Sequence, residues 1–67
     1  MEITHPNITV RLTGTDGNVY AIIGAVKKAM KAGGVSRAEI SEFTDTCFSQ
    51  PDYDSVLIHI MRTVDVE

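Results

Sequence analysis

Residues 33–40 carry a helix stop directly followed by a helix start, and this joint constrains the fold more than any other part of the sequence. Gly33 and Gly34 supply the left-handed backbone conformation that commonly ends a helix. Ser36 and Glu39 have the spacing of a capping box, in which each side chain bonds to the backbone amide of the other residue. The sequence therefore predicts two short helices joined by a tight elbow.

The helix before the elbow is predicted from residue 19 to residue 32. Its apolar side chains recur with a period of about 3.6 residues and fall on one face of a helix. They are Val19, Ile22, Ile23, Val26, Ala29 and Met30. Thr15 or Asp16 is the expected N-cap, because both side chains accept hydrogen bonds from free amides.

The helix after the elbow is predicted to be amphipathic as well. Val35 and Ile40 have the positions of a hydrophobic staple at its start. Its apolar face is expected to consist of Ile40, Phe43, Thr44, Cys47 and Phe48. The break at residues 49–52 then ends this helix.

A third helix is the preferred interpretation of the segment after Asp52, its expected N-cap. Its apolar stripe is expected to consist of Val56, Leu57, Ile60, Met61 and Val64. A strand is the competing interpretation, because Val56, Ile58 and Ile60 also alternate. The helix is preferred because a strand would leave Leu57 and Met61 facing outward.

Two strands are expected at the ends of the chain. Ile8, Val10 and Leu12 alternate with polar residues, as in a half-buried strand. Residues 62–66 form either the end of the third helix or a short strand. As a strand, they would pair with residues 8–13 and give an α+β domain of order β-α-α-α-β.

All of residues 1–67 are expected to form a single domain, with residues 1–7 frayed. A ribbon of two strands has an open edge, which invites a second copy of the chain. A homodimer with a shared four-stranded sheet is therefore one hypothesis for the assembly.

The net charge of −3 is unevenly distributed along the chain. Between residues 11 and 37, five Lys and Arg residues face one acid, whereas seven acids face one Arg from residue 38 onward. One cysteine excludes an internal disulfide. The first residues lack the basic and apolar pattern of a signal peptide, and no apolar stretch could cross a bilayer. A cytoplasmic protein without membrane contact is therefore expected.

Three segments resemble a group of small uncharacterised bacterial and phage proteins. They are residues 14–18 (Gly-Thr-Asp-Gly-Asn), 52–54 (Asp-Tyr-Asp) and 61–66 (Met-Arg-Thr-Val-Asp-Val). The resemblance covers nearly the whole chain. It implies no activity and no site residues, but it favours an accessory protein, such as one carried on a mobile element.

The elbow also resembles the turn and recognition-helix start of a lac-repressor-type helix-turn-helix. The segment 19–48 is therefore the basis of an alternative function as a nucleic-acid-binding regulator. The second helix would, however, present Glu42 and Asp45 beside Arg37. Because affinity for DNA comes mainly from Lys and Arg at phosphates, these acids argue against it.

Two candidate interaction faces emerge from the helices. The first helix carries Tyr20, Gly24, Lys27, Lys28 and Lys31 on one side, a set suited to an acidic protein or to RNA. Gly24 costs roughly 1 kcal/mol relative to alanine inside a helix, but its missing side chain would let a partner's backbone, or a neighbour within the same chain, approach closely. The second helix carries an acidic face of Glu39, Glu42 and Asp45. The alternative for both faces is that these charges are only solvated.

No credible catalytic, metal or cofactor site is expected. Cys47, His59 and Asp54 could form a nucleophilic site only if they met, but Cys47 is predicted in the core and His59 on the polar side of its helix. His5, His59 and Cys47 lack metal-ligand spacing. The loop that contains Gly14 and Gly17 lacks the lysine and the hydroxyl residue of a phosphate-binding loop.

The sequence therefore favours a non-enzymatic protein–protein interaction module that associates with itself or binds a protein partner. We expect neither a small-molecule substrate nor a cofactor. Nucleic-acid binding through residues 19–48 stays the alternative function.

Overall fold

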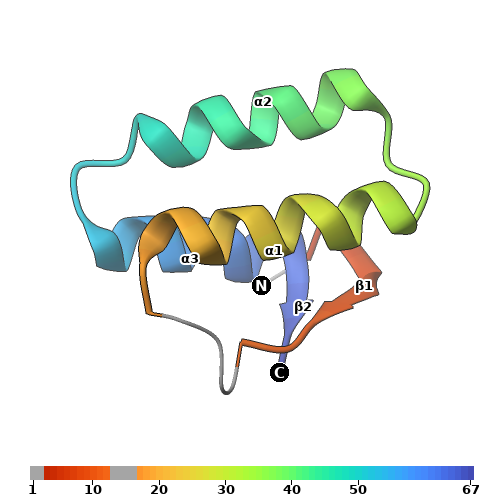
Figure 1. Ribbon diagram of the computed structural model, residues 1–67, viewed down its shortest axis with the longest axis horizontal. Coiled ribbons are helices and arrows are strands. Elements are labelled where there is room, and N and C mark those ends of the chain that lie inside the picture. Colours follow the sequence, from red (N-terminus) through yellow and green to blue (C-terminus); the bar gives the residue numbers. More distant parts are fainter. Residues whose placement is uncertain (1–2, 13–16) are drawn as a thin grey trace.

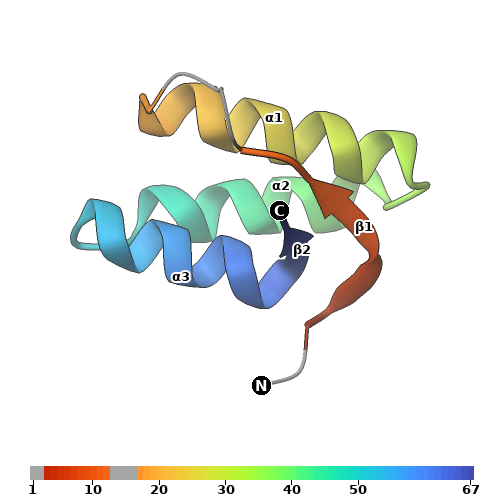
Figure 2. The same cartoon turned by 90° about the horizontal axis from the view of Figure 1, so that it is seen from below.

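A computed structural model describes residues 3–12 and 17–67 of the chain. The predicted β-α-α-α-β order is confirmed (Figure 1). The elements are β1 (His5–Val10), α1 (Val19–Ala32), α2 (Arg37–Phe48), α3 (Tyr53–Thr63) and β2 (Val64–Val66). Successive helices run antiparallel in both views, so α1 and α3 point the same way (Figures 1 and 2).

Helix α1 has the predicted bounds and the predicted buried face. Ile22, Ile23, Val26 and Met30 are its buried residues. Its N-cap is Asn18, whose side-chain oxygen accepts a hydrogen bond of 2.8 Å from the backbone N–H of Tyr20. The predicted caps Thr15 and Asp16 lie outside the described residues.

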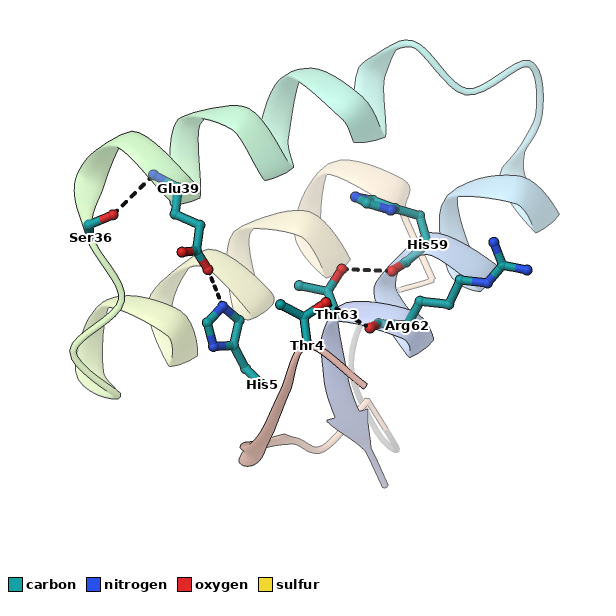
Figure 3. Close-up of polar contacts among 7 residues, drawn as sticks. All are labelled: Thr4, His5, Ser36, Glu39, His59, Arg62 and Thr63. Atoms are coloured by element: carbon teal, nitrogen blue, oxygen red, sulfur yellow. Dashed lines mark hydrogen bonds and ion pairs between the residues drawn. The ribbon is translucent and has the colours of Figure 1, made fainter. Parts of the chain in front are cut away.

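The elbow has the stop and start signals that the sequence indicates. Gly34 has a φ of +85°, a conformation that L side chains rarely adopt. The hydroxyl of Ser36 accepts a hydrogen bond of 3.2 Å from the N–H of Glu39, which is one half of the predicted capping box (Figure 3). For the other half, the structure differs from the prediction, because the Glu39 carboxylate contacts the Nε2 atom of His5 on β1 instead (Figure 3).

Helix α3 confirms the helical interpretation of its segment and its cap at Asp52, whose carboxylate accepts from the N–H of Ser55 at 2.8 Å. The predicted apolar stripe is partly wrong. Met61 is exposed, whereas Thr63 is buried and donates its hydroxyl proton to the carbonyl of His59 at 2.8 Å (Figure 3). The core-facing side of α3 is therefore rotated from Met61 toward Thr63 and α2, where the ring of His59 stacks on Phe43, and Val64 is buried as the first residue of β2.

The two strands pair in parallel, with Thr9 opposite Asp65 and Val10 opposite Val66. Parallel strands need a long crossover connection, which the three helices provide. Strand β1 begins at His5 rather than at Ile8, and the N–H of Thr4 already donates to the carbonyl of Arg62 at 2.9 Å. From Thr4 onward, the segment expected to fray is therefore attached to the fold, while residues 1 and 2 lie outside the described part.

The core lies where the three helices face one another and the inner sides of the strands. Met30, Val26, Ile60, Val64 and Cys47 are almost completely inaccessible to solvent. Each of the three helices and two strands contributes to this cluster, which includes Ile8 and Val10 of β1, and Val35 and Ile40 pack against it. Within the described residues, no helix has the length and apolar character needed to span a membrane.

Candidate functional site

A pocket of about 490 Å³ lies at the elbow, between the end of α1 and the start of α2. It is lined by Lys27, Lys28, Lys31, Val35, Arg37 and Ile40, and we call it the basic pocket. Val35 and Ile40 are half-buried because they pack against the core as the predicted staple, so they form its apolar part. Four cationic side chains thus surround two aliphatic ones.

The charges of the basic pocket are not neutralised within the described part of the chain. The ion pairs there are His5 with Glu39 and Arg11 with Glu67, and neither involves a residue of the pocket. Glu39 lies near the start of α2 but is directed to β1 by its contact with His5 (Figure 3). The pocket therefore offers positive charge next to an apolar surface, which suits an anionic group attached to an apolar one.

A smaller hollow of about 250 Å³ adjoins the basic pocket along the boundary of α1 and α2. Lys27, Arg37 and Ile40 line both, and Ser41, Thr44 and Asp45 complete this second hollow. Asp45 is the carboxylate residue in this lining. The positively charged surface therefore continues along α2 through this hollow and ends at Asp45.

The other end of the α1–α2 boundary is aromatic. The rings of Tyr20 and Phe48 lie with their centroids 5.6 Å apart, and both side chains are more than half exposed. Tyr53 lines the same small pocket of about 220 Å³ and donates its hydroxyl proton to the carbonyl of Gly17 at 3.0 Å. We call Tyr20, Phe48 and Tyr53 the aromatic end.

The candidate face on α1 is exposed, but it divides between these two regions. Lys27, Lys28 and Lys31 line the basic pocket, and Tyr20 belongs to the aromatic end. Gly24 lies between them on the same stripe of α1, and a Cβ added there would meet no atom within 4 Å. Internal packing among the described residues therefore does not explain this helix-weakening glycine.

The candidate acidic face on α2 is also divided. Glu39 and Glu42 border a polar hollow of about 390 Å³, whereas Asp45 borders the hollow beside Lys27. The carboxylates of the predicted face therefore do not form one uniform surface.

The polar hollow brings together two histidines that sequence reasoning left apart. It is lined by Thr4, His5, Met30, Glu39, Glu42, Phe43, Thr46, His59 and Thr63. The prediction that His59 faces the polar side of α3 is wrong: its ring stacks on Phe43 of α2, and its Nε2 atom is buried without a hydrogen-bond partner among the described residues. The reason is the rotation of α3 toward α2, which no local sequence pattern reveals.

The chemistry of the hollow is limited by its geometry. Among the described residues, no three His, Cys, Asp or Glu side chains lie close enough together to hold a metal ion. Burial, and to a lesser extent the charge of Arg62, lower the pKa of His59, so the ring is neutral near pH 7. An unprotonated imidazole in this position is a packing group with one unsatisfied nitrogen.

Cys47 lies in the core, as predicted. Burial raises the pKa of its thiol to about 11, which keeps it in the unreactive neutral form. Cys47 lines the pocket at the aromatic end, whereas His59 lines the polar hollow. The structure therefore does not bring these two residues to one hollow.

Comparison with protein-family models, with curated proteins and with solved structures found no match for this chain. The resemblance to small bacterial and phage proteins stays a prediction. The surfaces described above are consequently the basis for a functional proposal.

Proposed function

We propose that this protein is a non-enzymatic interaction module whose basic pocket binds an acidic segment of a protein partner. The segment would place an apolar side chain against Val35 and Ile40 and carboxylates beside the surrounding Lys and Arg residues. Such a combination gives affinity through the apolar anchor and specificity through charge.

The observation that carries this proposal is the association of four cations with an apolar surface in one pocket, without an ion pair to any described carboxylate. Cations that merely keep a surface soluble need no apolar neighbours. Gly24 supports the proposal as well, because it lies on α1 between Tyr20 and Lys27 and a Cβ added there would meet no atom of the described residues within 4 Å. A peptide lying along the α1–α2 boundary would reach from the basic pocket toward the aromatic end.

The same cations also favour the alternative, a nucleic-acid-binding regulator. The arrangement of the helices supports the protein partner instead. Helices of a helix-turn-helix cross at roughly 90–120°, whereas α1 and α2 run antiparallel in both views (Figures 1 and 2). The phosphates of a nucleic acid would also make no favourable contact with the apolar side chains of the basic pocket.

The two functions are separated by titrating ¹⁵N-labelled protein with three defined probes. The first is a short peptide in which one Leu lies among Asp and Glu residues, the second has Ser in place of this Leu, and the third is a DNA duplex of mixed sequence. We expect the Leu peptide to shift the amide signals of residues 27–40, and the Ser peptide to bind about tenfold more weakly. Tighter binding of the duplex, with a steep loss of affinity in salt, would instead establish the alternative.

Two matched charge reversals test whether the peptide binds at the basic pocket. Arg37→Glu is expected to abolish peptide binding, whereas Arg11→Glu changes the net charge equally but lies outside the basic pocket and should reduce it much less. Equal losses in the two variants would mean that net charge rather than the pocket attracts the peptide, and the proposal would then be wrong.

A further inference from the structure

Helix α3 carries a second exposed apolar surface that the proposed function does not use. Its buried side consists of Val56, Ile60 and Thr63, whereas Ile58 and Met61 are 43% and 49% exposed. Figure 2 shows α3 along one edge of the molecule, with no other helix or strand against its outer side. Two large apolar side chains, one turn apart, are therefore unpartnered on this side within the described residues.

The charges on the same side are arranged symmetrically about Ile58. Asp54 lies four residues before it, in the first turn of α3, and Arg62 lies four residues after it, in the last turn. Residues four apart lie above one another on a helix. Asp54, Ile58 and Arg62 thus form one line along α3, with Met61 beside it, and we call these four residues the α3 stripe.

We propose that the α3 stripe pairs with the same stripe of a second copy of this chain, in antiparallel orientation. With the twofold axis at Ile58, the two isoleucines meet at the centre of the contact. Asp54 of each copy then faces Arg62 of the other, which gives two identical ion pairs, as twofold symmetry requires. A parallel arrangement would instead place like charges together.

The complementarity of the stripe with itself is what selects a second copy as the occupant. An apolar centre flanked by opposite charges at equal distances fits its own reversed image without any further feature. The size of the α3 stripe limits the strength of the dimer contact. A helix of 11 residues is about 16 Å long, so the contact belongs among the small, transient interfaces rather than the obligate ones.

The test is sedimentation velocity of the full chain at concentrations from about 10 µM to about 1 mM. We expect a reversible monomer–dimer equilibrium in which Ile58→Asp raises the dissociation constant at least about tenfold. Tyr20→Asp is the matched control, because it places the same charge at an exposed side chain of the aromatic end and should leave the equilibrium unchanged. A monomer throughout this range, or a dimer insensitive to Ile58→Asp, would overturn the proposal.

Exchange of the charges tests the antiparallel geometry directly. Asp54→Arg and Arg62→Asp each place like charges opposite one another and should each weaken the dimer by about tenfold. A mixture of these two variants should form a heterodimer as readily as the unmodified chain, because both of its ion pairs are attractive. Circular dichroism of each variant establishes that α3 stays folded. Failure of the folded variants to complement each other would exclude the proposed pairing, whatever the result of peptide binding at the basic pocket.

Discussion

The imidazole of His59 stacks on the ring of Phe43, with centroids 5.2 Å apart and planes inclined by 21°. This contact joins α3 to α2 on one side of the core, and the Nε2 atom of His59 is buried there without a hydrogen-bond partner in the described part of the chain. Protonation would place a charge at this buried nitrogen beside Arg62. Burial first and the charge of Arg62 second therefore lower the pKa of His59 from its ordinary value of 6.5.

Acid is therefore expected to destabilise the fold through His59. Below a pH of about 6.5, the unfolded chain binds the proton more readily than the folded protein, so the free energy of unfolding falls as the pH decreases. The loss continues until the pH passes the lowered pKa of the folded state. Urea unfolding at several pH values measures this dependence.

The matched comparison uses His5→Gln as the background, because the sequence has two histidines and this change leaves His59 as the one to be tested. In this background, replacement of His59 by Gln should flatten the pH dependence between about pH 7.5 and about pH 5. An unchanged slope would contradict the role assigned to His59.

Two isoleucines on opposite sides of α3 provide a test of the core. Ile60 is completely buried, whereas Ile58 is 43% exposed. Ile60→Val should lower the free energy of unfolding by about 1 kcal/mol because it leaves a small void, and Ile58→Val should change it by less than about 0.5 kcal/mol. Chemical denaturation of dilute samples, where self-association is negligible, measures both. Equal effects would mean that α3 is rotated differently.

Two glycines are expected to respond in opposite directions to alanine. Gly34 has a φ of +85°, so Gly34→Ala should destabilise the elbow by about 1 kcal/mol. Gly24 lies inside α1 with open space around its Cα, so Gly24→Ala should stabilise the protein by about 0.5–1 kcal/mol. Thermal unfolding of the two variants beside the unmodified protein checks the signs. Destabilisation by Gly24→Ala would indicate a packed neighbour at that position.

Cys47 should be protected from thiol reagents in the folded protein. Its thiol is buried and its pKa is raised to about 11, so little thiolate exists near pH 8. Labelling with a disulfide reagent should be slow in buffer and fast in concentrated urea, with the ratio of rates reporting the opening of the core. Equally fast labelling under both conditions would contradict the burial of Cys47.

The basic pocket was only partly accessible to prediction. The three lysines could be assigned to one face of α1 because their spacing follows the helical period. Arg37, Val35 and Ile40 could not be joined to them, because their place beside α1 depends on the direction in which α2 leaves the elbow. No sequence pattern predicts the polar hollow, because His5 and His59, which both line it, belong to opposite ends of the chain.

The sequence by itself determined the helices, their order and most of their ends. The hydrophobic periodicity and the caps, such as Ser36 and Asp52, act over three or four residues, so they can be recognised in the sequence without knowledge of the fold. Tertiary structure decided the rotation of α3, the parallel pairing and earlier start of β1, and the contact of Glu39 with His5 rather than with its own helix. These features depend on which elements meet, and that is settled by packing of the whole core rather than by any local pattern.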